Sequence, residues 1–192
     1  MDNILQKKPE DICKDILNIE DNENVKIEVD DKSKSSLYVF LTNTIYIANK
    51  EIKTKSKEKQ NKSKVLVIAH ECAHSLQSKA MQVINFTLSN IEMILFAIIL
   101  VARIFFEKSD MLVNAYTITA ILSIIVRLYL EMDATINSVK ITTKYMLKNK
   151  VKTKDVKDLV ALYKKELLKT MPLFILMLFG FKIIRLIISM VI

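Results

Sequence analysis

The sequence predicts a mainly α-helical protein with a small β-sheet, forming a compact α+β lobe, and about three transmembrane helices. Two observations lead to this fold class. The 192 residues include only one glycine and two prolines, so few residues interrupt helices. Hydrophobic residues make up 51% of the chain and charged residues 26%, and the two kinds are segregated along it. A chain of this length is expected to form one structural unit, or a small polar lobe joined to a membrane part.

The first part of the chain, residues 1–82, is expected to hold a short helix, a small sheet and a second helix. Residues 9–17 begin with a proline suited to a first helical turn and continue with an apolar stripe. Residues 25–29 alternate between apolar and polar side chains, as a half-buried strand does. Residues 37–41 and 44–47 are two further candidate strands, close enough in sequence to be joined by a turn.

The second helix carries the motif His70-Glu71-Cys72-Ala73-His74, and its histidines are the only two in the chain. Positions i and i+4 lie on one face of a helix, so both imidazoles can bind one metal ion. Glu71 lies between them, close enough to act as a general base. The pattern therefore predicts a zinc site of the metalloprotease type, with His70 and His74 as ligands and Glu71 as the catalytic residue. The alternative is two unrelated histidines on a lysine-rich helix.

Long apolar stretches follow the motif. Residues 83–106 and 111–130 are each long enough to cross a bilayer. Only four residues separate them, so residues 83–132 are expected to form an antiparallel helical hairpin. Residues 171–192 form a third span, preceded by Thr170 as a candidate N-cap. Buried helices of a soluble core are the alternative, but spans this long and apolar favour a membrane.

Residues 133–170, between the second and third spans, are polar and basic. Apolar residues recur there at helical spacing, which predicts an amphipathic helix with a lysine-rich face. They are Val156, Leu159, Val160, Tyr163 and Leu167. This helix is expected to lie on the membrane surface or to pack against the helix that carries the motif.

A catalytic zinc usually has three protein ligands and a water, so the two histidines need one more ligand. Without a third histidine, this ligand is a carboxylate or Cys13. Glu92 falls inside the first apolar span, where the alternative is a carboxylate paired within the helix bundle. Glu131 lies at the end of the second span, which the hairpin returns to the level of the histidines. We therefore expect Glu131 as the third ligand, with Glu92 as the alternative.

The composition also indicates partners and location. The net charge of +8 comes mainly from lysines beside apolar spans, with no nucleic-acid motif, so an anionic membrane surface is favoured over nucleic acid. The cysteines, Cys13 and Cys72, are too few for a disulfide framework and suit a reducing compartment. Lysines are concentrated in residues 1–80 and 133–170, whereas the hairpin loop carries only Lys108. The positive-inside rule then predicts a multi-pass protein of the cell membrane whose site faces the cytoplasm.

Two segments carry a resemblance to a known family. The run from His70 to Gln77, followed by a hydrophobic hairpin and Glu131-Met132-Asp133-Ala134-Thr135, resembles the membrane-bound neutral zinc metallopeptidases of the YugP type. The resemblance implies a zincin-like lobe of the gluzincin kind, with Zn²⁺ as cofactor, His70, His74 and Glu131 as its ligands, and Glu71 as base. Ala73 replaces a common glycine and Thr135 a common serine or aspartate. Neither change removes a ligand, and Asp133 and Thr135 are candidates to orient a histidine.

These residues together predict a membrane-bound zinc metallopeptidase that hydrolyses peptide bonds in a peptide or protein substrate. An extended substrate is expected to pair with an exposed edge of the strand at residues 44–47. The alternative function is that of a non-proteolytic membrane protein with a structural or regulatory zinc site. Glu71 argues against this alternative, because a structural site has no use for a base between its ligands.

Overall fold

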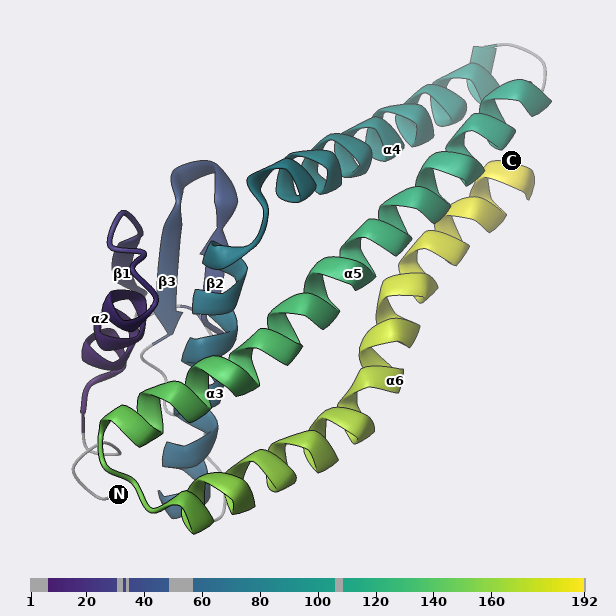
Figure 1. Cartoon of the computed structure of the whole chain (residues 1–192). Coiled ribbons are helices and arrows are strands. Elements are labelled where there is room, and N and C mark those ends of the chain that lie inside the picture. Colours follow the sequence, from purple (N-terminus) through teal and green to yellow (C-terminus); the bar gives the residue numbers. More distant parts are fainter. Residues whose placement is uncertain (1–6, 31–32, 34, 49–56, 106–108, 192) are drawn as a thin grey trace. The chain divides into compact units, whose positions relative to one another are not determined.

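The computed structural model of the chain describes residues 7–30, 33, 35–48, 57–105 and 109–191 (Figure 1). It is mainly helical with one small three-stranded sheet, which confirms this part of the predicted fold class. The elements in chain order are α2 (Pro9–Ile19), β1 (Lys26–Asp30), β2 (Leu37–Val39), the 3-10 helix η1 (Phe40–Thr42), β3 (Thr44–Ala48), α3 (Lys57–Leu76), α4 (Lys79–Phe105), α5 (Asp110–Lys148) and α6 (Thr153–Val191).

The chain divides into two compact units, each made of two segments. Unit 1 comprises Met1–Gln77 and Glu131–Lys164, and unit 2 comprises Ser78–Leu130 and Lys165–Ile192. Two long helices therefore contribute to both units, α5 and α6.

The sheet of unit 1 has the strand order β1-β3-β2, with β3 parallel to β1 and antiparallel to β2. Because β3 is paired on both sides, the prediction that residues 44–47 offer an exposed edge is wrong. The chain turns back through η1 and through Asn43, which adopts a left-handed conformation with φ of 49° that asparagine tolerates well. β3 thus returns beside β2, and β2 is left as an edge strand.

The core of unit 1 joins the apolar faces predicted from periodicity. The stripe of α2 is buried against the sheet and α3, and the second half of α5 and the start of α6 complete this core. Its members include Ile12, Cys13, Ile16, Ile45, Ile47, Val65, Ala69, Cys72, Ala134, Tyr145, Met146, Val156 and Leu159. The amphipathic face expected within residues 133–170 is therefore buried in this core at Val156 and Leu159, with Tyr163 packed against it.

Unit 2 contains α4, the first part of α5 and the last part of α6. In α4 and α5 an apolar window is long enough to cross a membrane, and only 11% and 28% of these windows are buried within the protein. Apolar helices left uncovered by protein are suited to lipid rather than to a soluble core. Contacts join Glu92 to Ser123 and Phe96 to Tyr116, so α4 and α5 run antiparallel, as the predicted hairpin requires.

Two helices within the described residues meet the criteria for a span, one fewer than the three predicted. The third predicted span, residues 171–192, lies in α6. The structure describes the helical backbone of this segment up to Val191, but not the side chains of several of its residues, 171–175 among them. The prediction that a helix begins here with Thr170 as its N-cap is wrong, because α6 begins at Thr153 and continues through Pro172. A change from polar to apolar side chains does not end a helix, and helices in apolar surroundings tolerate proline.

Candidate metal centre

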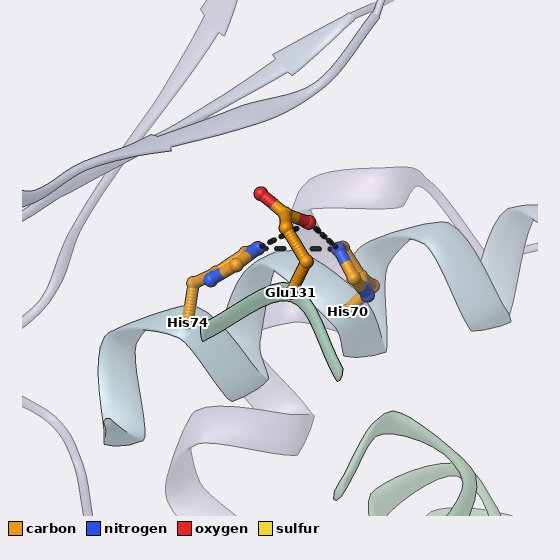
Figure 2. A group of neighbouring side chains, drawn as sticks. All are labelled: His70, His74 and Glu131. Carbon is orange, nitrogen blue, oxygen red and sulfur yellow. Dashed lines mark hydrogen bonds and ion pairs between the residues drawn. The ribbon is translucent and has the colours of Figure 1, made fainter. Parts of the chain in front are cut away.

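The HExxH motif lies in the last two turns of α3. One face of this helix is packed into the core of unit 1 through Val65, Ile68, Ala69 and Cys72. The two histidines lie on another face, with 23% and 17% of their side chains exposed. Their Nε2 atoms are 3.1 Å apart and their ring centroids 4.7 Å apart (Figure 2). The i, i+4 spacing therefore brings both ring nitrogens to one point, as the sequence predicts.

Glu131 enters the same point from α5. Its Oε2 atom lies 3.5 Å from Nε2 of His70 and 3.6 Å from Nε2 of His74 (Figure 2). Ligand atoms about 2.1 Å from a tetrahedral ion lie about 3.4 Å from one another. Two imidazole nitrogens and a carboxylate oxygen at these separations fit one metal ion. The structure thus brings together the three residues that the sequence singled out as ligands.

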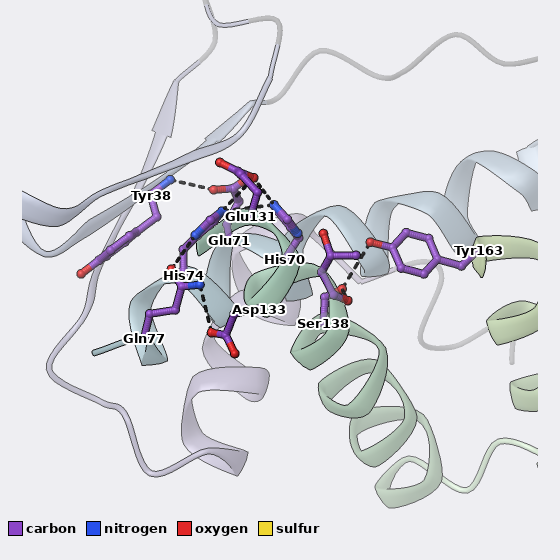
Figure 3. A network of polar contacts seen from close by, with 10 residues as sticks. Tyr38, His70, Glu71, His74, Gln77, Glu131, Asp133, Ser138 and Tyr163 are labelled. Carbon is purple, nitrogen blue, oxygen red and sulfur yellow. Dashed lines mark hydrogen bonds and ion pairs between the residues drawn. The ribbon is translucent and has the colours of Figure 1, made fainter. Parts of the chain in front are cut away.

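Glu71 lies beside this group but faces the sheet. Its Oε2 atom accepts a hydrogen bond of 2.8 Å from the backbone N–H of Tyr38, on the edge strand β2 (Figure 3). Burial raises the pKa of Glu71 above its usual value, and the neighbouring His70 and His74 offset this only in part. Glu71 is therefore a carboxylate held next to the candidate ligands with one oxygen bound by the edge strand.

A chain of hydrogen bonds extends from His74 away from the other two candidate ligands. Its Nδ1 atom lies 2.9 Å from Oε1 of Gln77, and Nε2 of Gln77 donates a bond of 3.0 Å to Oδ2 of Asp133 (Figure 3). Burial lowers the pKa of His74, but its contacts with Glu131 and Gln77 raise it by more, so the net pKa is above the usual value. Asp133 thus reaches a histidine as expected, although only through Gln77.

Thr135, the other candidate to orient a histidine, has a different contact. Its carbonyl accepts a hydrogen bond of 2.7 Å from the Ser138 hydroxyl, which also lies 3.3 Å from the hydroxyl of Tyr163 (Figure 3). These bonds link successive turns of α5 to α6 in unit 1.

Cys13, the other candidate for the third ligand, points into the core instead. Its Sγ atom lies 3.6 Å from Sγ of Cys72, and both side chains are fully buried. The hydrogen bond with Cys13 and burial together raise the pKa of the Cys72 thiol well above its usual value. Both cysteines therefore pack α2 against α3.

Glu92, the alternative third ligand, belongs to a charge cluster in unit 2. Its side chain is 2% exposed, and its Oε2 accepts hydrogen bonds from Nζ of Lys182 and, at 2.8 Å, from the Ser123 hydroxyl. Lys182 also donates to Oγ of Ser123 at 2.6 Å, and Arg185 lies 3.6 Å from Oε1 of Glu92. Glu92 is therefore paired within the helix bundle, which is the alternative that its place in an apolar span suggested.

Two residues at this centre were assigned no role from the sequence, although Gln77 belongs to the run that carries the family resemblance. Gln77 follows His74 by three positions, a spacing that places the two side chains on one face of a helix and therefore offers a signal. Tyr38 contributes its backbone N–H, which leaves no trace in the residue type. No family model, no curated protein and no solved structure matches this chain.

Proposed function

We propose that this chain is a membrane-bound zinc metallopeptidase. The observation that carries the proposal is the grouping of His70, His74 and Glu131, with the carboxylate of Glu71 beside it (Figure 3). Two imidazoles and one carboxylate are the protein ligands of one common class of catalytic zinc site. The resemblance of these segments to the YugP-type metallopeptidases supports the same assignment.

The proposed roles follow from the positions of the side chains. His70, His74 and Glu131 hold the zinc ion through Nε2, Nε2 and a carboxylate oxygen. When bound, zinc supplies a Lewis acid for the scissile carbonyl and makes water a stronger nucleophile at neutral pH. Glu71 accepts a proton from the attacking water and passes it to the leaving amine. One water is thus consumed for each peptide bond that is cleaved, and Glu71 returns to its starting state.

The substrate is proposed to bind beside β2. This strand is the edge of the sheet next to Glu71, and its Tyr38 N–H points away from β3 toward the candidate site. An extended peptide added to such an edge gains main-chain hydrogen bonds with little dependence on its own side chains. The strand at residues 37–39 thus replaces the strand at residues 44–47 as the proposed substrate edge.

A structural or regulatory zinc site is the second candidate function. Structural zinc sites are usually closed by four protein ligands, whereas catalytic sites keep a position for water or substrate. Among the described residues, the group that could hold a metal has three members, and the nearby Glu71 is suited to act as a base. These features favour the enzyme.

We also propose that the protein is multi-pass, with the last part of α6 as a third membrane helix and the metal site on the cytoplasmic side. Lys182 and Arg185 are the charges that oppose membrane insertion of this segment, and both lie at Glu92. A paired charge costs far less in lipid than an isolated one. The lysines on either side of the hairpin support the cytoplasmic orientation by the positive-inside rule.

The decisive experiment compares the full-length protein, purified in a mild detergent, with its Glu71→Gln variant. Hydrolysis of a fluorescently labelled unfolded protein and zinc content per chain are both measured. Glutamine keeps the size of the side chain but cannot accept the proton, so we expect zinc to remain near one per chain while hydrolysis falls about 10²–10⁴-fold.

Glu28→Gln on β1 is the matched control, because this exposed glutamate belongs to the same unit but has no part in the site. It should leave both quantities unchanged. Equal hydrolysis by the wild type and by Glu71→Gln would rule out the proposed mechanism. Stoichiometric zinc without any hydrolysis in the wild type would favour the structural or regulatory site.

A further inference from the structure

The hydrogen bonds that run from Asp133 through Gln77 to Nδ1 of His74 have donors and acceptors that follow from the chemistry of these groups. The carboxylate of Asp133 only accepts, so Gln77 must direct its amide NH₂ toward it, at 3.0 Å. The amide oxygen of Gln77 then faces Nδ1 of His74, at 2.9 Å. An amide oxygen also only accepts, so Nδ1 of His74 must carry the proton. In neutral His74, the other ring nitrogen, Nε2, then carries the lone pair.

The same reasoning extends to the far side of Asp133. Its second oxygen, Oδ1, accepts a hydrogen bond of 2.9 Å from Nδ2 of Asn137, and the Asn137 oxygen accepts one of 3.3 Å from Nζ of Lys140. An ammonium group only donates, so this end of the chain also has one possible direction. Both oxygens of Asp133 are thereby held, and its orientation toward Gln77 is determined by two contacts.

The backbone holds Gln77 close to His74. It follows the last residue of α3, and its N–H donates to the His74 carbonyl at 3.3 Å. The residue is only 8% exposed, so water competes little for its amide. Nε2 of His74 in turn lies within 3.6 Å of both Nε2 of His70 and Oε2 of Glu131.

We propose that Gln77 and Asp133 are positioning residues that hold His74 in the Nδ1–H tautomer, so that its Nε2 lone pair is directed to the metal position. The inference rests on the proposed function of this centre as a metal site. Partners of this kind fix the tautomer and orientation of a ligating imidazole and typically affect metal affinity about 10–100-fold. Here an amide relays the effect of the carboxylate, which does not itself contact the ring.

The first test is spectroscopic and needs no metal. The chain has only two histidines, so the full-length protein labelled with ¹⁵N-histidine gives two sets of ring signals, which a His70→Ala variant assigns. In the metal-free wild type we expect His74 in the Nδ1–H form, and in Gln77→Ala a mixture of tautomers. An unchanged tautomer in Gln77→Ala would overturn the inference.

The second test is zinc affinity, measured by competition with a chelator. Gln77→Ala and Asp133→Ala should bind zinc about 10–100-fold more weakly than the wild type. Gln82→Ala is the matched control, because it removes a similarly buried glutamine from α4, in the other unit. Its affinity should be that of the wild type.

A rescue separates positioning from loss of folding. In Gln77→Glu combined with Asp133→Asn, the carboxylate and the amide exchange places. The new carboxylate at position 77 still accepts the hydrogen bond from Nδ1 of His74, and the new amide at position 133 donates to that carboxylate. The tautomer and the zinc affinity should therefore recover. Failure to recover in a folded double variant would contradict the inference. If the wild type binds no zinc, the proposed function fails, whereas the tautomer measurement still decides the positioning role.

Discussion

The carboxylate of Glu92 gives the sharpest test of how unit 2 is held together. Glu92→Gln removes its charge but keeps its volume, so no cavity forms. The change leaves the ammonium of Lys182 and the guanidinium of Arg185 without the carboxylate that they contact. Removing one partner of a buried ion pair costs about 3–5 kcal/mol.

The surroundings of Lys182 and Arg185 decide where in this range the loss of unfolding free energy falls. The side chains of Lys182 and Arg185 keep 17% and 34% of their surface exposed, so both can shift toward water or headgroups. The Ser123 hydroxyl also remains as an acceptor for Lys182. We therefore expect the free energy of unfolding to fall by about 3 kcal/mol, at the lower end of the range for buried pairs.

The assay is unfolding of the full-length protein in mild detergent by increasing fractions of sodium dodecyl sulfate, followed by helical circular dichroism. Zinc content is measured on the same samples. Adding Lys182→Met to Glu92→Gln should restore more than half of the loss, because neutral groups of similar volume often replace a buried ion pair at little cost. Unfolding of Glu92→Gln at the wild-type detergent fraction would refute the reasoning, as would a double variant less stable than the single one.

The matched substitution Glu131→Gln addresses the ligand role. It should lose most of the bound zinc, whereas Glu92→Gln should keep it, because only Glu131 lies with the histidines. The opposite pattern of zinc content would transfer the ligand role to Glu92.

Two further predictions concern the cysteines and the topology. Cys13 and Cys72 are fully buried, so neither should react with N-ethylmaleimide in the folded protein and both should react after denaturation; rapid labelling of the native protein would contradict the packing of α2 on α3. A cysteine introduced by Ser109→Cys, next to the loop between α4 and α5, should be labelled by a membrane-impermeant reagent added to intact cells, as the positive-inside rule requires; protection of this cysteine would reverse the proposed orientation.

Local periodicity in the sequence was enough to predict most of the elements. The stripe of residues 9–17, the alternation at residues 25–29 and the apolar spans each reflect backbone geometry within one segment. The i, i+4 spacing of His70 and His74 belongs to the same class, since a single helix brings the two ring nitrogens to 3.1 Å. The start of α6 was missed because the sequence changes its polarity at residue 170 without ending the helix.

Contacts between segments were decided only by the tertiary structure. The sequence favoured Glu131 as the third ligand and left Glu92 and Cys13 as alternatives. Packing places Glu131 with the histidines and pairs Glu92 with Lys182 and Cys13 with Cys72. The order of the strands was also decided by the tertiary structure, because hydrogen bonding between strands makes β3 central and leaves β1 and β2 as the edges.

The contact of Glu71 with a backbone N–H could not be predicted from the sequence, and neither could the route from Asp133 to His74 through Gln77, although Asp133 itself was a candidate to orient a histidine. The physical reason is that periodicity records which face of an element is apolar. The donors and acceptors that meet across two elements depend instead on how those elements pack.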